Sequence, residues 1–310
     1  MELLYWFESI RTPALDTVMS LITRLGEESF FLLAALLVFW CVDKRRGYYL
    51  LTVGFVGTVA SQWLKVACAV PRPWVKDPDF TIVESARAAA TGYSFPSGHT
   101  QSAVGYLGSI ARFTSRWWLR AVCIVLALLV AVSRMYLGVH TPADVGVGLL
   151  ISLVLVLALY PLLESTLWFP NRMYLIIAAM LALSGAFVVY MELTVPPVGS
   201  AEVLMEAYGN WAEAHKNAYS LLGAVSGVLP VYFFDSKVLQ FPTRAPWWGQ
   251  IVKLAGGVAL VLAVKTLLKA PLLAFCGGHD AAHALRYFLV VLVAGCLWPM
   301  TFRFFEKYAK

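Results

Sequence analysis

Long apolar runs bounded by charged residues constrain this chain more than any other feature. Lipid offers the backbone no water to bond to, so each run must satisfy its own polar groups as a helix. The residues AVILMFWYC make up 60% of the 310-residue chain and Asp, Glu, Lys and Arg only 14%, whereas a soluble domain has about 25% charged residues. An ordinary soluble globule is therefore excluded. The pattern predicts an all-α fold, a polytopic membrane helical bundle.

About nine runs are apolar and long enough to be transmembrane helices, several of them near the short limit. The predicted spans are 28–42, 47–66, 99–114, 117–138, 143–163, 173–191, 217–234, 248–268 and 286–303. Residues 1–27 mix charges with Leu, Trp and Phe, which predicts an N-terminal interfacial amphipathic helix and not a cleaved signal. The segment 192–216 carries four glutamates and predicts a solvated outer loop that can be partly helical.

The distribution of charge predicts the orientation in the membrane. If the first span enters from outside, the segments predicted to be cytoplasmic are 43–46, 112–120, 164–172, 235–253 and the tail from residue 303. These segments hold 13 of the 24 Lys and Arg residues but only four of the 18 Asp and Glu residues. Short cytoplasmic segments are enriched in Lys and Arg, so the net charge of +6 is explained by topology. We expect a multi-pass protein of the cell membrane whose partner is the lipid bilayer. A nucleic-acid partner is not expected, because no basic stripe is interleaved with aromatic residues.

Polar residues that are costly to keep near lipid gather in three stretches. These are LKVACAVPRPW with Lys65 and Arg72, PSGH with Ser97, Gly98 and His99, and SRMYLGVHTPAD with Arg134, His140 and Asp144. The 34 residues from His99 to Ser133 suffice for two antiparallel helices, which return the chain to the same face. Residues 74–95 lack the apolar length for a further crossing. We therefore expect all three stretches to meet at the extracytoplasmic face.

The chemistry of these residues suits a multiply charged anion. Lys65, Arg72 and Arg134 supply three cations, and a guanidinium can direct two N–H groups at neighbouring phosphoryl oxygens. Ser97 and Gly98 begin a predicted helix, whose first amides and dipole favour an anion. Such a phosphate site needs no metal and no cofactor. His279, Asp280 and His283 have spacing compatible with a metal site, but we regard a metal there as the weaker interpretation.

Two histidines can divide the catalytic work. Thr141 to Asp144 has the pattern of an N-cap, a proline at the first helical position and an acid two residues later. Asp144 can cap this helix and also accept the Nδ1–H of His140, which leaves Nε2 as a nucleophile that forms a phosphohistidine. His99 can protonate the leaving oxygen and later act as the base. Each stretch alone could be a capped or snorkelling helix end; together, on one face, they favour catalysis.

In this order, K-x6-R-P, P-S-G-H and S-R-x5-H-x3-D look like the motifs of the type 2 phosphatidic acid phosphatase (PAP2) superfamily. That family shares its phosphate pocket with glucose-6-phosphatase and vanadium-dependent haloperoxidases. The resemblance implies catalytic roles for His140, His99 and Asp144 and phosphate-binding roles for Lys65, Arg72, Ser97, Gly98 and Arg134. It suggests an N-terminal segment 1–27, a PAP2-like catalytic core 28–165, and additional transmembrane helices over 166–310 that no motif assigns.

The leading hypothesis is an integral-membrane phosphatase that hydrolyses a lipid phosphomonoester or pyrophosphate. The resemblance leaves phosphatidate, phosphatidylglycerol phosphate and undecaprenyl pyrophosphate all open as substrates. A lipid phosphotransferase that uses the same intermediate is the alternative. A lipid transporter is less favoured, because the ionisable residues lie at helix ends and not in broken helices at the midplane.

Overall fold

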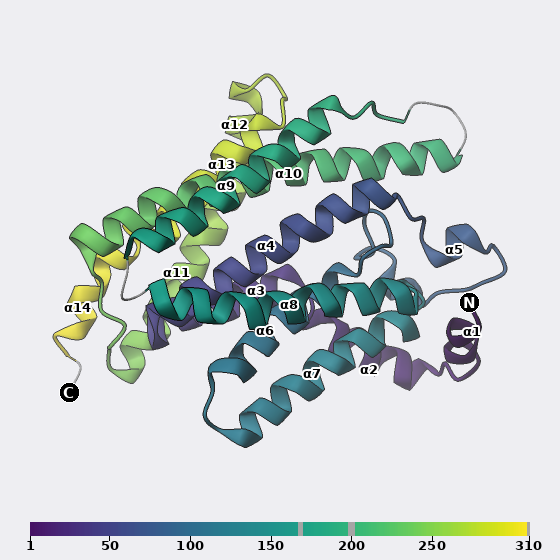
Figure 1. The fold of residues 1–310 in the computed structure, drawn as a ribbon, viewed down its shortest axis with the longest axis horizontal. Coiled ribbons are helices and arrows are strands. Elements are labelled where there is room, and N and C mark those ends of the chain that lie inside the picture. The colour runs from purple at the N-terminus through teal and green to yellow at the C-terminus, as the bar shows by residue number, and fades with distance from the viewer. Residues whose placement is uncertain (167–169, 198–201, 309–310) are drawn as a thin grey trace. The chain divides into compact units, whose positions relative to one another are not determined.

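The computed structural model describes residues 1–166, 170–197 and 202–308, and within these ranges every regular element is helical (Figure 1). Among the described residues, seven helices are long and apolar enough to cross a membrane, or eight if the bent pair Pro13–Arg24 and Glu28–Val42 is one span. The prediction of an all-α, multi-pass membrane protein is confirmed. The predicted span 99–114 corresponds to the helix Gly98–Phe113, whose 16 residues are near the short limit for crossing a bilayer.

The chain forms two compact units, which we describe separately. Unit 1 comprises Met1–Ala34, Tyr49–Leu162 and Pro196–Ala214, and unit 2 comprises Ala35–Tyr48, Leu163–Val195 and His215–Lys310. The division predicted from the sequence, into 1–27, 28–165 and 166–310, is based on the positions of motifs. The two units are instead defined by how compactly the chain packs, so the predicted division stays a prediction.

Unit 1 contains the three motif stretches. Its helices are α1 (Glu2–Ser9), α2 (Pro13–Arg24), the start of α3 (Glu28–Leu37), most of α4 (Lys44–Cys68), α5 (Pro73–Lys76), the short turn Glu84–Ala86, α6 (Gly98–Phe113), α7 (Trp117–Tyr136) and most of α8 (Pro142–Thr166). Helices α6 and α7 are antiparallel neighbours (Figure 1). The chain thus goes out and back as expected, so the end of α7 lies near the start of α6.

The N-terminal segment packs against the end of α7. Thr12 caps α2, because its Oγ1 accepts the Leu15 N–H at 3.3 Å, and Pro13 takes the first helical position. Arg11 donates from Nε and Nη2 to the Tyr136 carbonyl at 3.2 and 3.1 Å. Phe7 packs in one buried cluster with Tyr136. Helices α1 and α2 are therefore part of unit 1, and their predicted place at the membrane interface stays a prediction.

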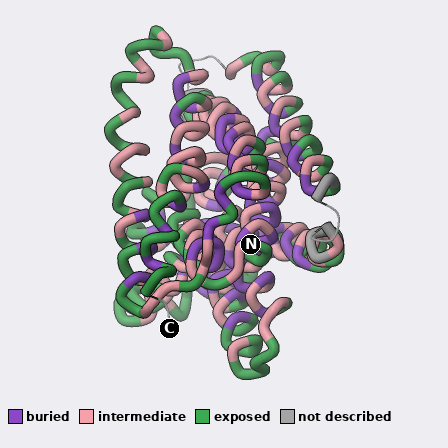
Figure 2. Tube along the Cα trace, turned by 90° about the vertical axis from the view of Figure 1, so that its left-hand side faces the viewer, coloured by how far each residue is buried: buried purple, intermediate pink, exposed green. Residues whose placement is uncertain are grey.

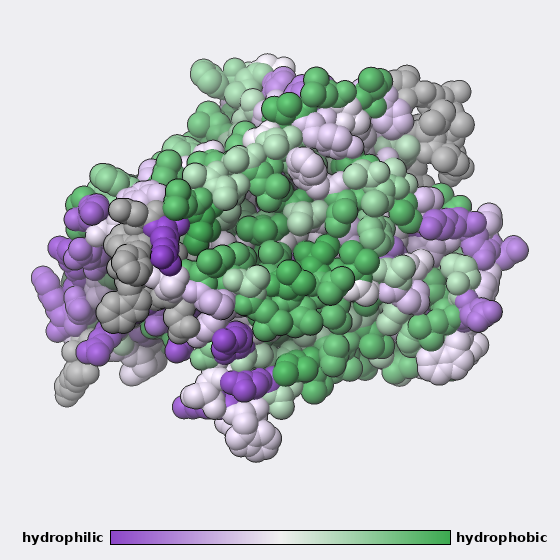
Figure 3. Space-filling view, in the orientation of Figure 1, coloured by the Kyte–Doolittle hydropathy of each residue, from purple (hydrophilic) through white to green (hydrophobic). Residues whose placement is uncertain are grey.

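The outer faces of α7 and α8 are apolar and exposed. Leu150 and Leu157 of α8 are 57% and 54% exposed, and Figure 3 shows a hydrophobic surface over α8. Buried and exposed residues alternate along the helices in Figure 2. Exposed apolar helix faces are unfavourable in water but match the hydrocarbon of a bilayer.

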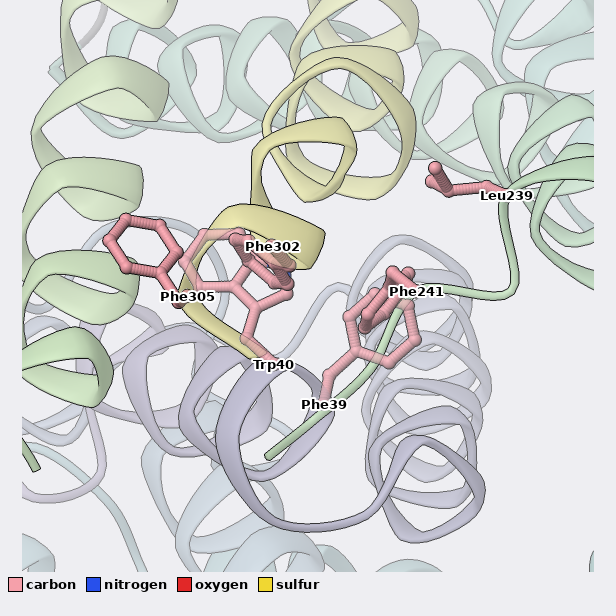
Figure 4. Close-up of a cluster of buried hydrophobic side chains, with 6 residues drawn as sticks. All are labelled: Phe39, Trp40, Leu239, Phe241, Phe302 and Phe305. Carbon is pink, nitrogen blue, oxygen red and sulfur yellow. The ribbon is translucent and has the colours of Figure 1, made fainter. Parts of the chain in front are cut away.

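Unit 2 is built from the remaining helices around an aromatic core. They are α9 (Pro170–Leu193), most of α10 (Glu202–Phe234), α11 (Trp247–Leu267), α12 (Lys269–Phe275), α13 (Ala281–Leu292) and α14 (Phe302–Glu306), with single π-helical turns at Val38–Val42, Asp235–Leu239 and Val293–Leu297 and a 3₁₀ turn at Pro299–Thr301. Figure 4 shows the core side chains Phe39, Trp40, Leu239, Phe241, Phe302 and Phe305. Beside this core, Lys44 and Asp235 form an ion pair of 2.9 Å.

Helix α10 corrects the prediction for its region. The expected span began at residue 217, but the helix begins at Glu202 and has 33 residues. The stretch from 202 to 216 contains no proline, and its charged residues are good helix formers that continue the helix beyond the apolar run. Most of the predicted outer loop is thus helical, and its residues 198–201 lie outside the described residues.

Candidate active site

The start of α6 presents free amides at the motif P-S-G-H. Ser97 caps the helix, since its Oγ accepts from the Thr100 N–H and hydroxyl at 3.4 and 2.9 Å. The first intrahelical bond runs from the Gln101 N–H to the Ser97 carbonyl at 3.0 Å. A Cβ on Gly98 would have no atom within 4 Å. An anion can therefore approach the amides of Gly98 and His99, which precede that first bond.

A tight turn at the end of α7 brings Arg134 and His140 together. Gly138 has φ +80°, the left-handed conformation that glycine adopts without steric cost. The Val139 N–H bonds to the Arg134 carbonyl at 3.2 Å and the Gly138 N–H to the Met135 carbonyl at 3.0 Å. These two bonds make a Schellman motif. The chain leaves the helix and returns beside its last turn.

The start of α8 fixes the carboxylate of Asp144. The Asp144 N–H donates to Thr141 Oγ1 at 3.3 Å, and the Thr141 N–H donates to Asp144 Oδ2 at 2.7 Å. This reciprocal capping box is the predicted one. Oδ2 also accepts the hydroxyl of Ser94 at 2.6 Å. The predicted contact to His140 Nδ1 measures 3.7 Å, which is longer than a hydrogen bond, because Ser94 and Thr141 already hold the carboxylate oxygen.

The imidazole of His140 is held neutral. Its Nε2 lies 3.0 Å from Arg72 Nη1, and since a guanidinium can only donate, Nε2 accepts and carries no proton. His140 is only 2% exposed. Burial, followed by the positive charges of Arg72, Arg134 and Lys65, lowers the pKa of His140 well below its usual range. An unprotonated Nε2 is the form that a nucleophile needs.

Arg134 and His99 have buried N–H or ring nitrogen atoms without a protein partner. Arg134 is fully buried, and its Nη1 donates to Thr23 Oγ1 at 2.8 Å. Its Nε and Nη2, and His99 Nε2, are buried without a hydrogen-bond partner among the described residues. Orphaned buried donors are costly. Phosphoryl oxygens can satisfy the Arg134 donors.

All eight residues predicted for the site lie in unit 1 and are close together. Arg72, Arg134, Lys65 and His99 all act electrostatically on His140. Lys65, at the end of α4, donates to the Tyr93 carbonyl, and the Ser97 N–H donates to the Asp144 carbonyl at 2.9 Å. These contacts, all within the described part of the chain, bring together the eight predicted site residues Lys65, Arg72, Ser97, Gly98, His99, Arg134, His140 and Asp144.

Three residues of this region were not predicted from the sequence. Thr23 holds Arg134 and Ser94 holds Asp144. Gly26 lies against His99, because a Cβ there would stand 2.8 Å from the His99 carbonyl oxygen. Thr23 and Gly26 come from the N-terminal segment, and no local spacing connects them with the motifs. Ser94 lies three residues before Ser97, but its hydroxyl had no distinguishing pattern.

The metal site considered at His279, Asp280 and His283 has no support in the described ranges. Within them, no group of three His, Cys, Asp or Glu residues is arranged to hold a metal ion. Asp280 Oδ2 instead lies 2.7 Å from His215 Nδ1. His279 Nδ1 accepts the Ala281 N–H at 3.0 Å. These residues are engaged with one another and with the backbone.

Two family models match the chain in its two halves. The model described as PAP2 superfamily matches residues 45–168, and the model described as PAP2 superfamily phosphatase, transmembrane extension, matches residues 219–310. The first range contains all eight site residues. The second range covers much of the part to which no motif assigned a role.

Three relatives are membrane-lipid phosphatases by name. A probable sphingosine-1-phosphate phosphatase of Dictyostelium discoideum is 30% identical over 164 residues, 49% of this chain and 39% of that protein. Phosphatidylglycerophosphatase B of Bacillus subtilis (strain 168) is 30% identical over 161 residues, 47% of this chain and 74% of that protein. An undecaprenyl-diphosphatase of Sulfolobus acidocaldarius is 29% identical over 140 residues, 44% and 65% of the two chains.

The match spans less than half of the Dictyostelium relative's length. No solved structure matches the chain. The Bacillus relative is covered over most of its length, and the eight motif residues fall within the matched family range and lie close together in unit 1. On these grounds the chain belongs to the PAP2 superfamily.

Proposed function

We propose that the protein is an integral-membrane lipid phosphatase, which hydrolyses a lipid phosphomonoester or diphosphate through a phosphohistidine. The observation that carries this proposal is the position of unprotonated His140 Nε2, 3.0 Å from Arg72 Nη1, in a buried region where Arg134 has two unpartnered nitrogen atoms. Nucleophile and anion-binding groups thus lie side by side.

The reaction proceeds in two displacements. His140 Nε2 attacks phosphorus, the phosphorus–oxygen bond to the lipid breaks, and His99 gives its proton to the departing oxygen. A bound phosphate favours the protonated form of His99, since opposite charges at short range stabilise it. Water then attacks the phosphohistidine with His99 as base, and inorganic phosphate leaves. Arg134, Lys65 and the amides of Gly98 and His99 stabilise the charge on the equatorial oxygens.

The substrate class follows from the membrane setting and the relatives. A headgroup can reach the cationic region while its hydrocarbon chain stays beside the apolar helices, which avoids extraction of the lipid into water. The named relatives supply the substrates to test, namely sphingosine 1-phosphate, phosphatidylglycerol phosphate and undecaprenyl diphosphate, with phosphatidate added from the motif resemblance. The predicted orientation puts the reaction at the extracytoplasmic face of the cell membrane.

The test is a phosphate-release screen of purified protein in detergent over these lipids, with His140→Ala as the control. Release without an added acceptor supports hydrolysis, whereas strict dependence on an acceptor favours the phosphotransferase. Acid-labile labelling of His140 by a phosphate-labelled substrate tests the intermediate. Turnover of a water-soluble short-chain substrate by right-side-out vesicles, but not by sealed inside-out vesicles, tests the sidedness.

A further inference from the structure

One end of unit 2 carries positive charges that the proposed reaction does not use. This end is formed by the last turn of α11, by α12 and by the first half of α13. Its cationic side chains are Lys265 on α11, Lys269 on α12 and Arg286 on α13, and Lys216 on α10 joins them. Lys265 Nζ and Arg286 Cζ lie 5.7 and 5.0 Å from the ring centroid of Tyr287. The other two lysines and Arg286 act electrostatically on His283, so the group is compact.

Arg286 is the unusual member of this group. It is only 7% exposed and lies five residues into α13, inside a candidate membrane span. Its Nε is buried without a hydrogen-bond partner among the residues that the structure describes. A charged group kept inside a membrane helix is expensive and marks a functional site by default.

The carboxylates of Asp280 and Glu192, in the same unit, are engaged by other residues. Asp280 lies 2.7 Å from His215 Nδ1 through Oδ2 and 3.5 Å from His283 Nε2 through Oδ1. Glu192 Oε1 lies 3.0 Å from His215 Nε2 and accepts the Tyr219 hydroxyl at 2.7 Å. Within the described ranges no carboxylate forms an ion pair with Arg286. Among the described residues, the buried Arg286 Nε thus has neither a hydrogen-bond partner nor a carboxylate in an ion pair.

We propose that this end of unit 2 is a second phosphate-binding site, which takes the headgroup phosphate of an anionic phospholipid. Phosphate oxygens can accept hydrogen bonds from the Arg286 guanidinium, and the lysines add positive charge, as in the basic pockets between membrane helices that bind lipid headgroups. Leu267 and Phe275, at the ends of α11 and α12, are 73% and 83% exposed and provide an apolar surface for the acyl chains. The site uses none of the eight residues of the catalytic region, and the inference does not depend on the proposed function.

The test compares lipid binding by the full-length protein and by Arg286→Gln. Native mass spectrometry of the detergent-solubilised protein should show a preference for phosphatidylglycerol over phosphatidylcholine. Loss of a charge-assisted contact should reduce that preference about tenfold in Arg286→Gln. Lys237→Gln, which removes an exposed cation from the turn Asp235–Leu239, is the matched control and should bind as the parent does. Phosphate release by Arg286→Gln should stay within about twofold of the parent, which separates this site from the catalytic one.

Two further measurements test the site, namely lipid binding by a double lysine variant and thermal stabilisation by inorganic phosphate. If Arg286→Gln does not fold, the double variant Lys265→Gln and Lys269→Gln, with its partly or fully exposed side chains, should also lose the preference. Inorganic phosphate that raises the melting temperature of the parent but not of Arg286→Gln, without a phosphatidylglycerol preference, would keep the anion site and overturn the lipid source. An unchanged lipid preference in Arg286→Gln would overturn the site itself.

Discussion

His140 in unit 1 and His215 in unit 2 are both flanked by charged groups, but these groups have opposite signs. His140 Nε2 faces the Arg72 guanidinium at 3.0 Å, and this nitrogen must accept. Both ring nitrogens of His215 instead face carboxylates, Asp280 at 2.7 Å and Glu192 at 3.0 Å. The first arrangement keeps the proton off Nε2, whose lone pair can attack phosphorus once the hydrogen bond from Arg72 is released. The second uses the ring to link α9, α10 and the turn before α13.

The largest difference in turnover should appear when the two histidines are removed one at a time. His140→Ala deletes the nucleophile, and loss of such a group costs at least about 10⁴-fold in turnover. His215→Ala instead leaves two carboxylates without their common partner, so it should lower the melting temperature while kcat changes by less than about threefold. Phosphate release and thermal unfolding of the two variants measure both effects.

The opposite pattern would break the comparison. If His140→Ala kept near-normal turnover, the phosphohistidine mechanism would be wrong. If His215→Ala lost turnover as completely as His140→Ala while remaining folded, unit 2 would contribute directly to the chemistry.

The next effect concerns the unpartnered donors of Arg134. Arg134→Lys keeps the charge but loses the planar fork, and its bond to Thr23 at 2.8 Å can no longer orient the remaining donors. We expect kcat/KM to fall about 100-fold, with Arg134→Ala similar or lower. Arg112→Lys is the matched control, because Arg112 lies 4.0 Å from the Tyr160 ring centroid and not at the catalytic region. Full activity of Arg134→Lys would show that charge alone suffices there.

A smaller effect is expected for Ser94, which acts through Asp144. Ser94 and Ser109 are both fully buried, but Ser94 donates to Asp144 Oδ2 at 2.6 Å and Ser109 to the Gly105 carbonyl at 2.6 Å. Ser94→Ala removes one of the hydrogen bonds to this oxygen and leaves the bond from the Thr141 N–H, so the carboxylate is held less firmly and kcat should fall about tenfold. We expect KM to change little and Ser94→Thr to recover part of the loss. A fall of the same size in Ser109→Ala would reduce the role of Ser94 to packing.

The motif residues could be predicted from the sequence because local backbone rules position them. Ser97 caps α6, Gly138 ends α7, and Thr141 with Asp144 caps α8, and each of these features has a short-range pattern. The antiparallel pair α6 and α7 then required only helix length to bring the motifs to one face.

Contacts between distant residues could not be predicted in this way. Thr23 is 111 residues from Arg134 and Ser94 is 50 residues from Asp144, and a threonine or serine at those positions carries no spacing that indicates its partner. The start of α10 was also misplaced, because hydropathy marks where a helix enters lipid and not where it begins. The burial of Arg286 Nε without a hydrogen-bond partner among the described residues likewise depends on tertiary packing, which the sequence pattern does not show.

The smallest effect, on the pH profile, tests why His140 stays neutral. Burial and then the charge of Arg72 lower its pKa, so Nε2 stays unprotonated as the pH falls through about 6.5, the ordinary value. The acid limb of kcat/KM should therefore lie below that pH. Arg72→Gln removes the charge but not the burial, which is the larger cause, so the limb should move only part of the way back up. A phosphomonoester itself titrates near pH 6, and comparing both proteins on one substrate cancels that titration. An acid limb that Arg72→Gln leaves in place, or moves further down, would mean that the guanidinium does not keep the proton off His140, and the contrast with His215 would then rest on geometry alone.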